Sequence, residues 1–194
     1  MKTTNLLTVL LLLAAAAAHA ADLPNEDLEA HRATCRTAME KLGDSLKSAL
    51  QAAMKEGGPI NALGVCNVKA VPIAETISTE EGLLVGRTAL KTRNPDNAPD
   101  GWEEATLLDF QARLDADEKL KDLEAWTVIT DDAGHRTFRY MKAIGTMPMC
   151  LKCHGERLDS EVAARVAELY PQDRAVGFKA GDLRGAFSVR MPLD

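Results

Sequence analysis

Residues 126–144 read Trp-Thr-Val-Ile-Thr-Asp-Asp-Ala-Gly-His-Arg-Thr-Phe-Arg-Tyr-Met-Lys-Ala-Ile, and this stretch separates the chain from all-helical folds. Trp126 to Thr130 and Arg136 to Ile144 are rich in β-branched and aromatic residues, which favour strands. The intervening residues, 131–135, contain two aspartates and a glycine, which favour a turn. A β-hairpin is therefore predicted here. A second hairpin is predicted from Gly177 to Lys179 and Gly185 to Met191, around Gly181-Asp182.

Helices are expected mainly in the N-terminal half. Apolar side chains recur every seven residues from Leu28 to Ala49, which predicts a long amphipathic helix over about 25–56. Gly57-Gly58-Pro59 should end it, because glycine adopts the left-handed cap and proline cannot continue the ladder. Further predicted elements are a short element over 60–65, a helix from Pro72 through Ile77, a strand from Leu83 to Leu90, and helices from Asp100 to Leu114 and Ser160 to Leu169. Early helices and late hairpins without βαβ alternation predict an α+β domain with an antiparallel sheet.

Five residues separate the first hairpin from Cys150-Leu151-Lys152-Cys153-His154. Two thiols three positions apart, followed at once by an imidazole, form the attachment motif of a c-type haem. Each thiol can form a thioether with a haem vinyl group, and His154 would then be an axial ligand of the iron. The cofactor expected from this motif is one covalently attached haem c.

The first twenty residues support this interpretation. Met1-Lys2 is followed by an apolar run from Leu6 to Ala18, and Ala18-His19-Ala20 has the small-x-small pattern of a cleavage site. We expect residues 1–20 to be a signal peptide and residues 21–194 to form one periplasmic domain without a membrane span. The formal net charge of −6, without a basic cluster, argues against nucleic acid as a partner.

Two other uses of a CxxC pair remain as alternatives. A zinc site needs two further ligands, but Cys35 and Cys66 lie too far apart in sequence to form a second close pair. A thioredoxin-like dithiol would sit early in a βαβ unit, whereas this motif comes late. Among haem proteins, the late position fits poorly with small cytochromes c, and the hairpins exclude a four-helix cytochrome.

Six stretches of the chain follow a known pattern: Gly57-Gly58-Pro59, Val65 to Ala70, Val85 to Thr88, Arg93 to Asp100, Cys150 to Gly155 and Gly181 to Ser188. In these stretches the chain resembles the PAS-like c-type haem domains, a family of unknown function whose members occur alone or as sensory modules. The resemblance implies a PAS-like antiparallel sheet, flanking helices and a long N-terminal helix. It also implies haem held between His154 and the thiolate of Cys66.

Residue arguments leave the second axial ligand open. Cys66 falls in an expected break between Gly64 and Pro72, outside any apolar stripe, where its side chain could face a cofactor. The alternative is a disulfide with Cys35, because exported cysteines commonly pair. Cys35 itself lies on the predicted helix stripe and is also explained as a core residue. Other possible ligands are Met141, Met147, Met149, His135 and, as the best of these, His31.

Arg87, Arg93 and Lys69 are candidates for pairing with haem propionates, since a guanidinium binds a carboxylate through two parallel hydrogen bonds. Two functions follow from a six-coordinate haem. The first is redox or gas sensing, in which reduction releases Cys66 and a small gas binds. The second is periplasmic electron transfer. Catalysis is not expected, because the sequence shows no nucleophile–base pair and no paired acids. The expected partners are the haem maturation machinery and a redox or signalling protein.

Overall fold

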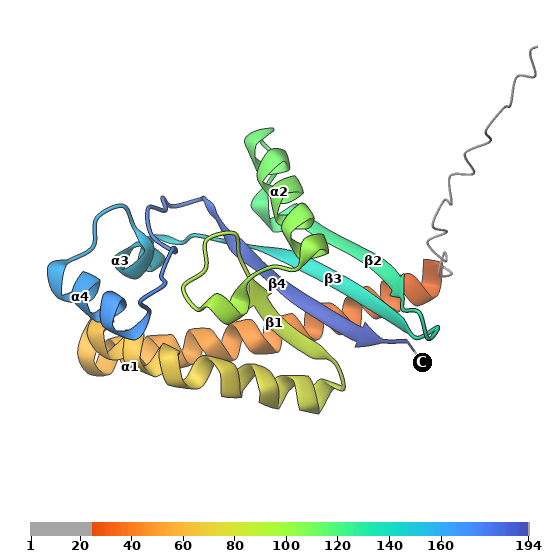
Figure 1. The fold of residues 1–194 in the computed structure, drawn as a ribbon, viewed down its shortest axis with the longest axis horizontal. Helices are drawn as coiled ribbons and strands as arrows, with labels where there is room; N and C mark the ends of the chain where they lie inside the picture. The colour runs from red at the N-terminus through yellow and green to blue at the C-terminus, as the bar shows by residue number, and fades with distance from the viewer. Residues whose placement is uncertain (1–24, 194) are drawn as a thin grey trace, which may run out of the picture.

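A four-stranded antiparallel sheet with the order β1-β4-β3-β2 forms the centre of the computed structural model, which describes residues 25–193 (Figure 1). The strands are β1 (Leu84–Thr88), β4 (Leu183–Pro192), β3 (Arg136–Gly145) and β2 (Glu124–Thr130). Helix α1 covers one face of the sheet and helix α2 lies against the other. The predicted α+β class is confirmed. The predicted signal peptide, residues 1–20, lies outside the described residues.

Helix α1 (Asn25–Glu81) is a bent helix whose two halves lie side by side. Gly57 and Gly58 leave the helical conformation at the bend, and Gly58 has a φ of +66°, which favours glycine. The second half turns back along the first, so that Lys41 pairs with Glu81 (Figure 1). The helix end predicted at Gly57-Gly58-Pro59 is thus present as a sharp bend.

The predicted break around Cys66 is wrong, because residues 59–81 are helical throughout. Leu63, Cys66, Ala70, Ile73 and Ile77 fall at three- and four-residue spacings, which place them on one face of this half. Pro72 interrupted the pattern in the sequence. In the structure Pro72 is exposed and costs one backbone hydrogen bond without ending the helix.

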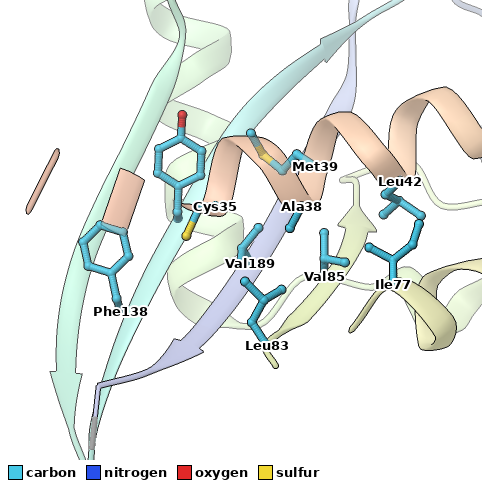
Figure 2. Packing of buried hydrophobic residues seen from close by; sticks show 10 residues of the cluster. Cys35, Ala38, Met39, Leu42, Ile77, Leu83, Val85, Phe138 and Val189 are labelled. Carbon is cyan, nitrogen blue, oxygen red and sulfur yellow. The ribbon is translucent and has the colours of Figure 1, made fainter. Parts of the chain in front are cut away.

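The larger core lies between α1 and the sheet. Cys35, Met39 and Leu42 of the first half of α1 pack with Ile77 of the second half (Figure 2). The sheet contributes Val85, Phe138, Tyr140 and Val189 to the same cluster. The seven-residue apolar stripe predicted for α1 therefore does face the core.

Helix α2 (Gly101–Asp115) begins at a complete capping box. The Asp100 carboxylate accepts from the backbone N–H of Glu103 at 2.9 Å, and the Glu103 carboxylate accepts from the backbone N–H of Asp100 at 3.0 Å. Leu107 and Phe110 then pack on Met141 and Ala186 from the opposite side of the sheet. The start predicted at Asp100 is confirmed.

The first predicted hairpin is confirmed, and the second is wrong. Strands β2 and β3 pair from Glu124–Lys142 to Thr130–Arg136 around the expected turn. Residues 177–179 form no strand, since Phe178 makes one isolated bridge to Gly155, and β4 pairs with β1 and β3. The backbone of this segment bonds the CxxCH turn in place of β4.

The remaining elements are short. They are η1 (Pro95–Asn97), η2 (Leu120–Asp122), η3 (Pro148–Cys150), α3 (Leu151–His154) and α4 (Ser160–Leu169). Helix α4 was predicted with these bounds. No helix within residues 25–193 is long and apolar enough to cross a bilayer.

Glu124 provides a test of how α1 is held on the sheet. Its carboxylate accepts hydrogen bonds from Arg32 and Arg36 of α1 and from the Tyr140 hydroxyl of β3. Burial alone would raise the pKa of Glu124, but these three donors outweigh it and lower the pKa to about 2. A depressed carboxyl pKa contributes stability above the unfolded pKa of about 4.3, and this contribution is lost as the pH falls towards 2.

Glu124→Gln should therefore lower the free energy of unfolding at pH 7 by roughly 2 kcal/mol. It should also reduce the loss of stability between pH 4.5 and pH 2. Urea unfolding across this pH range measures both effects. Glu104→Gln, at an exposed position of α2, is the matched control. Equal pH profiles for Glu124→Gln and the control would contradict the prediction.

Candidate haem site

The CxxCH segment forms a tight turn at the end of the sheet. Cys150 ends η3, while Cys153 and His154 belong to α3, so one continuous turn carries all three side chains. The turn closes through a 3.0 Å hydrogen bond from the Gly155 N–H to the Leu151 carbonyl. A Cβ atom at Gly155 would lie 2.6 Å from that carbonyl oxygen, so the turn requires glycine here.

His154 is oriented by a hydrogen bond between its Nδ1 atom and the Ala175 carbonyl, at 2.7 Å. A carbonyl only accepts, so Nδ1 carries the proton and Nε2 keeps its lone pair. Burial lowers the pKa of His154 to about 3, and the positive charges of Arg184 and Arg93 act in the same direction. The imidazole is therefore neutral at physiological pH, with one nitrogen free to bind a metal.

The segment around Ala175 also holds the backbone of the turn. The Phe178 N–H donates to the His154 carbonyl at 3.0 Å, and the Gly177 N–H donates to the Gly155 carbonyl at 3.1 Å. The Phe178 ring meets the His154 ring edge-on, with the ring centroids 6.3 Å apart. His154 is thus fixed by both its backbone and its ring.

Arg93 connects its own segment with the CxxCH turn and with the segment that contains Asp173. Its guanidinium binds the Asp173 carboxylate through two hydrogen bonds of 3.1 Å and donates to the Cys153 carbonyl at 2.5 Å. The side chains of Arg93 and Asp173 are only 10% and 8% exposed. Arg93 was predicted as a partner of a haem propionate, and the structure shows that its guanidinium already has a protein carboxylate as partner.

Cys66 lies beside the CxxCH turn. Leu63 shares an apolar cluster with Cys153, and Cys66 follows Leu63 by one helical turn on the same face. Burial raises the pKa of the Cys66 thiol, while the charges of Arg87 and Arg93 partly oppose that rise. Burial also raises the pKa of Cys153, and Cys66 adds to this effect. These electrostatic effects place Cys66, Cys153 and the two arginines in one region.

Cys35 is remote from this region and forms no disulfide. All four cysteines are free, and Cys35 is completely buried in the core beside Ala38 and Leu42. Burial raises the pKa of its thiol to about 12. This arrangement disagrees with a Cys35–Cys66 disulfide. It agrees with the other interpretation of Cys35, as a buried residue of the core.

The other candidate ligands take different positions. Met141 is buried in the core under α2, and His135 is exposed in the hairpin turn next to Asp131. His31 packs on Phe138 with ring centroids 5.6 Å apart. Figure 1 shows the start of α1, which carries His31, at the opposite end of the sheet from α3. Met147 is the N-cap of η3, and Met149 lies within η3 directly before Cys150.

Sequence reasoning missed Arg184. It lies at the start of β4, donates to the Lys91 carbonyl at 3.2 Å and stacks over the Phe178 ring at 5.2 Å. Burial, together with the positive charges of Arg93 and Arg87, lowers the pKa of Arg184 to about 10. Only the family-like stretch from Gly181 to Ser188 pointed to this residue in the sequence. Arg87, which was predicted, belongs to the same cluster, whereas Lys69 is exposed on α1.

Residues 25–193 contain no group of three or more His, Cys, Asp and Glu side chains placed to hold a metal ion. The zinc alternative therefore has no complete set of protein ligands in this part of the chain. The site has instead one oriented imidazole and three thiols from two segments, surrounded by arginines. Fold and site together define a class of α+β proteins in which a CxxCH turn lies against a bent helix that carries a further cysteine.

Comparison with known proteins identifies the family. The model of the Tll0287-like family matches residues 13–192, so the chain belongs to the Tll0287-like family. The crystal structure of the cyanobacterial haem protein Tll0287 is similar, with a TM-score of 0.59 and 28% sequence identity. The alignment covers 89% of this chain and 98% of that chain. A comparison with curated proteins finds no match.

The buried pair of Arg93 and Asp173 yields a stability prediction. Arg93→Gln should lower the free energy of unfolding by about 3 kcal/mol, because the Asp173 carboxylate is left buried without its cation. Arg93→Gln with Asp173→Asn should cost less than the sum of the two single changes. Urea unfolding of the four proteins measures the coupling.

Arg165→Gln is the matched control, since Arg165 forms an ion pair with Glu168 on the surface of α4. We expect this control to change stability by less than about 0.5 kcal/mol. Additive effects of Arg93→Gln and Asp173→Asn would show that the ion pair does not hold the loops together.

Proposed function

We propose that this chain is an exported c-type haem protein that senses redox state or a small gas. The observation that carries the proposal is the orientation of His154 within the CxxCH turn. The His154 Nδ1–H donates a hydrogen bond to the Ala175 carbonyl, which leaves the Nε2 lone pair available to a metal ion. Two thiols precede His154 at the spacing of haem attachment. The haem protein Tll0287 in the same family supports haem as the cofactor.

The residues present fit a haem group. Cys150 and Cys153 would hold it through thioether bonds, and His154 would bind the iron from one side. Iron supplies a one-electron couple, and thiolate ligation favours its ferric state. Around it, this chain supplies arginines whose positive charges suit haem carboxylates.

Cys66 is the proposed second axial ligand. Its thiol comes from a different element than the CxxCH turn, and the two segments pack together through Leu63 and Cys153. Burial raises the pKa of the free Cys66 thiol, so without a metal the proton is retained at neutral pH. A bound metal ion deprotonates a coordinating thiol.

Sensing is favoured over electron transfer by the position of Cys66 in α1. The helical segment that carries it begins directly after the bend at Gly57-Gly58 and contains Pro72, which removes a backbone hydrogen bond. A helical segment that starts at a bend and lacks a backbone hydrogen bond at Pro72 can shift when the ligand is released. The proposed role is therefore non-enzymatic, in the periplasm, with a signalling or redox protein as the partner.

Covalent attachment is the first test. Coexpressed with haem maturation proteins, the wild-type chain should keep its haem after denaturing electrophoresis. Cys150→Ser with Cys153→Ser should abolish this covalent haem, whereas Cys35→Ser, a core substitution, should retain it. Haem staining of the gel and a pyridine haemochrome spectrum measure the attachment. Failure of the wild-type chain to attach haem would overturn the proposed cofactor.

Ligation and function are tested by Cys66→Ser. The oxidised wild type should give a low-spin thiolate signature in its absorption and EPR spectra, and the variant should lose it. Reduced wild-type protein should bind CO, because the thiolate bond to iron weakens on reduction. An unchanged spectrum in Cys66→Ser would remove Cys66 as a ligand. A reduced protein that binds no CO but exchanges electrons rapidly and reversibly would favour electron transfer.

A further inference from the structure

Two arginines of the cluster around Cys66 and Arg93 form no ion pair with an acidic side chain among residues 25–193. They are Arg87 of β1 and Arg184 of β4. The Asp173 carboxylate acts on Arg184 only at longer range, because its two oxygens bind Arg93. The guanidinium groups of Arg87, Arg93 and Arg184 thus have one carboxylate in their neighbourhood, that of Asp173, and only Arg93 binds it. The cluster therefore has an excess of positive charge.

A β-bulge turns Arg184 towards this cluster. The pairing of β3 with β4 shifts register where Ile144 is opposite Gly185 and Gly145 is opposite Leu183, so Arg184 is the extra residue. Leu183 and Ala186 both pack under α2, although three residues of regular strand would put them on opposite faces. The bulge allows Leu183 and Ala186 to face α2 together, and it directs Arg184 away from α2.

Gly185 makes the bulge possible. Its φ is +153°, and a Cβ atom there would lie 2.4 Å from the Thr88 carbonyl oxygen of β1. β1 and β4 thus approach closely at this point, just after Arg87. The two unpaired arginines enter the same region from neighbouring strands.

The Phe178 ring connects Arg184 with the proposed iron ligand. Its edge meets the His154 ring, while the Arg184 guanidinium lies 5.2 Å and the Lys91 ammonium 5.4 Å from its centroid. Arg184 is therefore separated from the imidazole by one aromatic ring. An anionic group at the edge of a cofactor bound to His154 would be close to this cation.

We propose that Arg184 and Arg87 bind the two propionates of the haem, and that Arg93 does not. The inference rests on the proposed function, since it requires a covalently held haem. Each guanidinium offers a planar pair of N–H donors that matches a carboxylate, and the haem edge carries two carboxylates. Arg93 instead keeps its bonds to Asp173 and to the Cys153 carbonyl.

The test compares haem-loaded wild type with Arg184→Gln and Arg184→Lys. In Arg184→Gln the propionate-bending bands of the resonance Raman spectrum should shift. Its reduction potential should also fall, because a positive charge that favours the added electron is lost. Arg184→Lys should recover most of the potential but not the Raman bands, because lysine keeps the charge and lacks the fork.

Arg174→Gln is the charge-matched control, at an exposed position on the neighbouring loop. It should leave the propionate bands unchanged. If Arg184→Gln does not fold, the shift of the propionate bands in Arg184→Lys alone decides the question. Propionate bands in the Arg184 variants that match those of the control would overturn the inference.

Adding inorganic phosphate to the wild type tests whether the arginines bind an exchangeable anion in place of the haem propionates. We expect no change in the propionate bands or the reduction potential. A saturable shift at millimolar phosphate would mean that the arginines bind an exchangeable anion, and this would overturn the inference. A wild-type protein without covalent haem would instead overturn the proposed function, so the two failures are distinguishable.

Discussion

The ion pair between Arg93 and Asp173 is the interaction on which the site depends. The two residues are 80 positions apart in the sequence, and their guanidinium and carboxylate meet almost out of contact with water. Arg93 also holds the Cys153 carbonyl, and Asp173 accepts from the Ala175 N–H at 2.9 Å. The Ala175 carbonyl in turn accepts the hydrogen bond that the His154 Nδ1–H donates. The orientation of the imidazole therefore depends on a chain of contacts that begins at Arg93.

The bend in α1 is the second determinant of the site. It lets α1 cover the sheet with its first half and reach the CxxCH turn with its second half. Because Gly57 and Gly58 allow the reversal, Cys66 arrives beside Cys153 although the two belong to distant segments. The second cysteine is thus presented by a helix that is packed on the core at its far end, through Ile77.

Sequence reasoning was most successful where local patterns dominate. The apolar repeat of α1, the capping box at Asp100 and the hairpin around Asp131 all depend on residues within a few positions of one another. It failed at Cys66, where Pro72 suggested a break that tertiary packing overrides. It failed also at residues 177–179, whose backbone groups bond the CxxCH turn and not a neighbouring strand. Both errors come from contacts with distant parts of the chain.

The chemical groups available to this protein can be read from its sequence: two thiols and an imidazole at haem-attachment spacing, a further cysteine and a set of arginines. Which of these groups come together, and with which partners, follows from the fold. It pairs Arg93 with Asp173, leaves Arg87 and Arg184 without an acidic partner among residues 25–193, and buries Cys35 in the core under α1. Spacing along the chain predicts contacts only between groups that lie within the same turn, as in the CxxCH motif. Partners from separate segments depend instead on a bend at Gly58 and a bulge at Gly185.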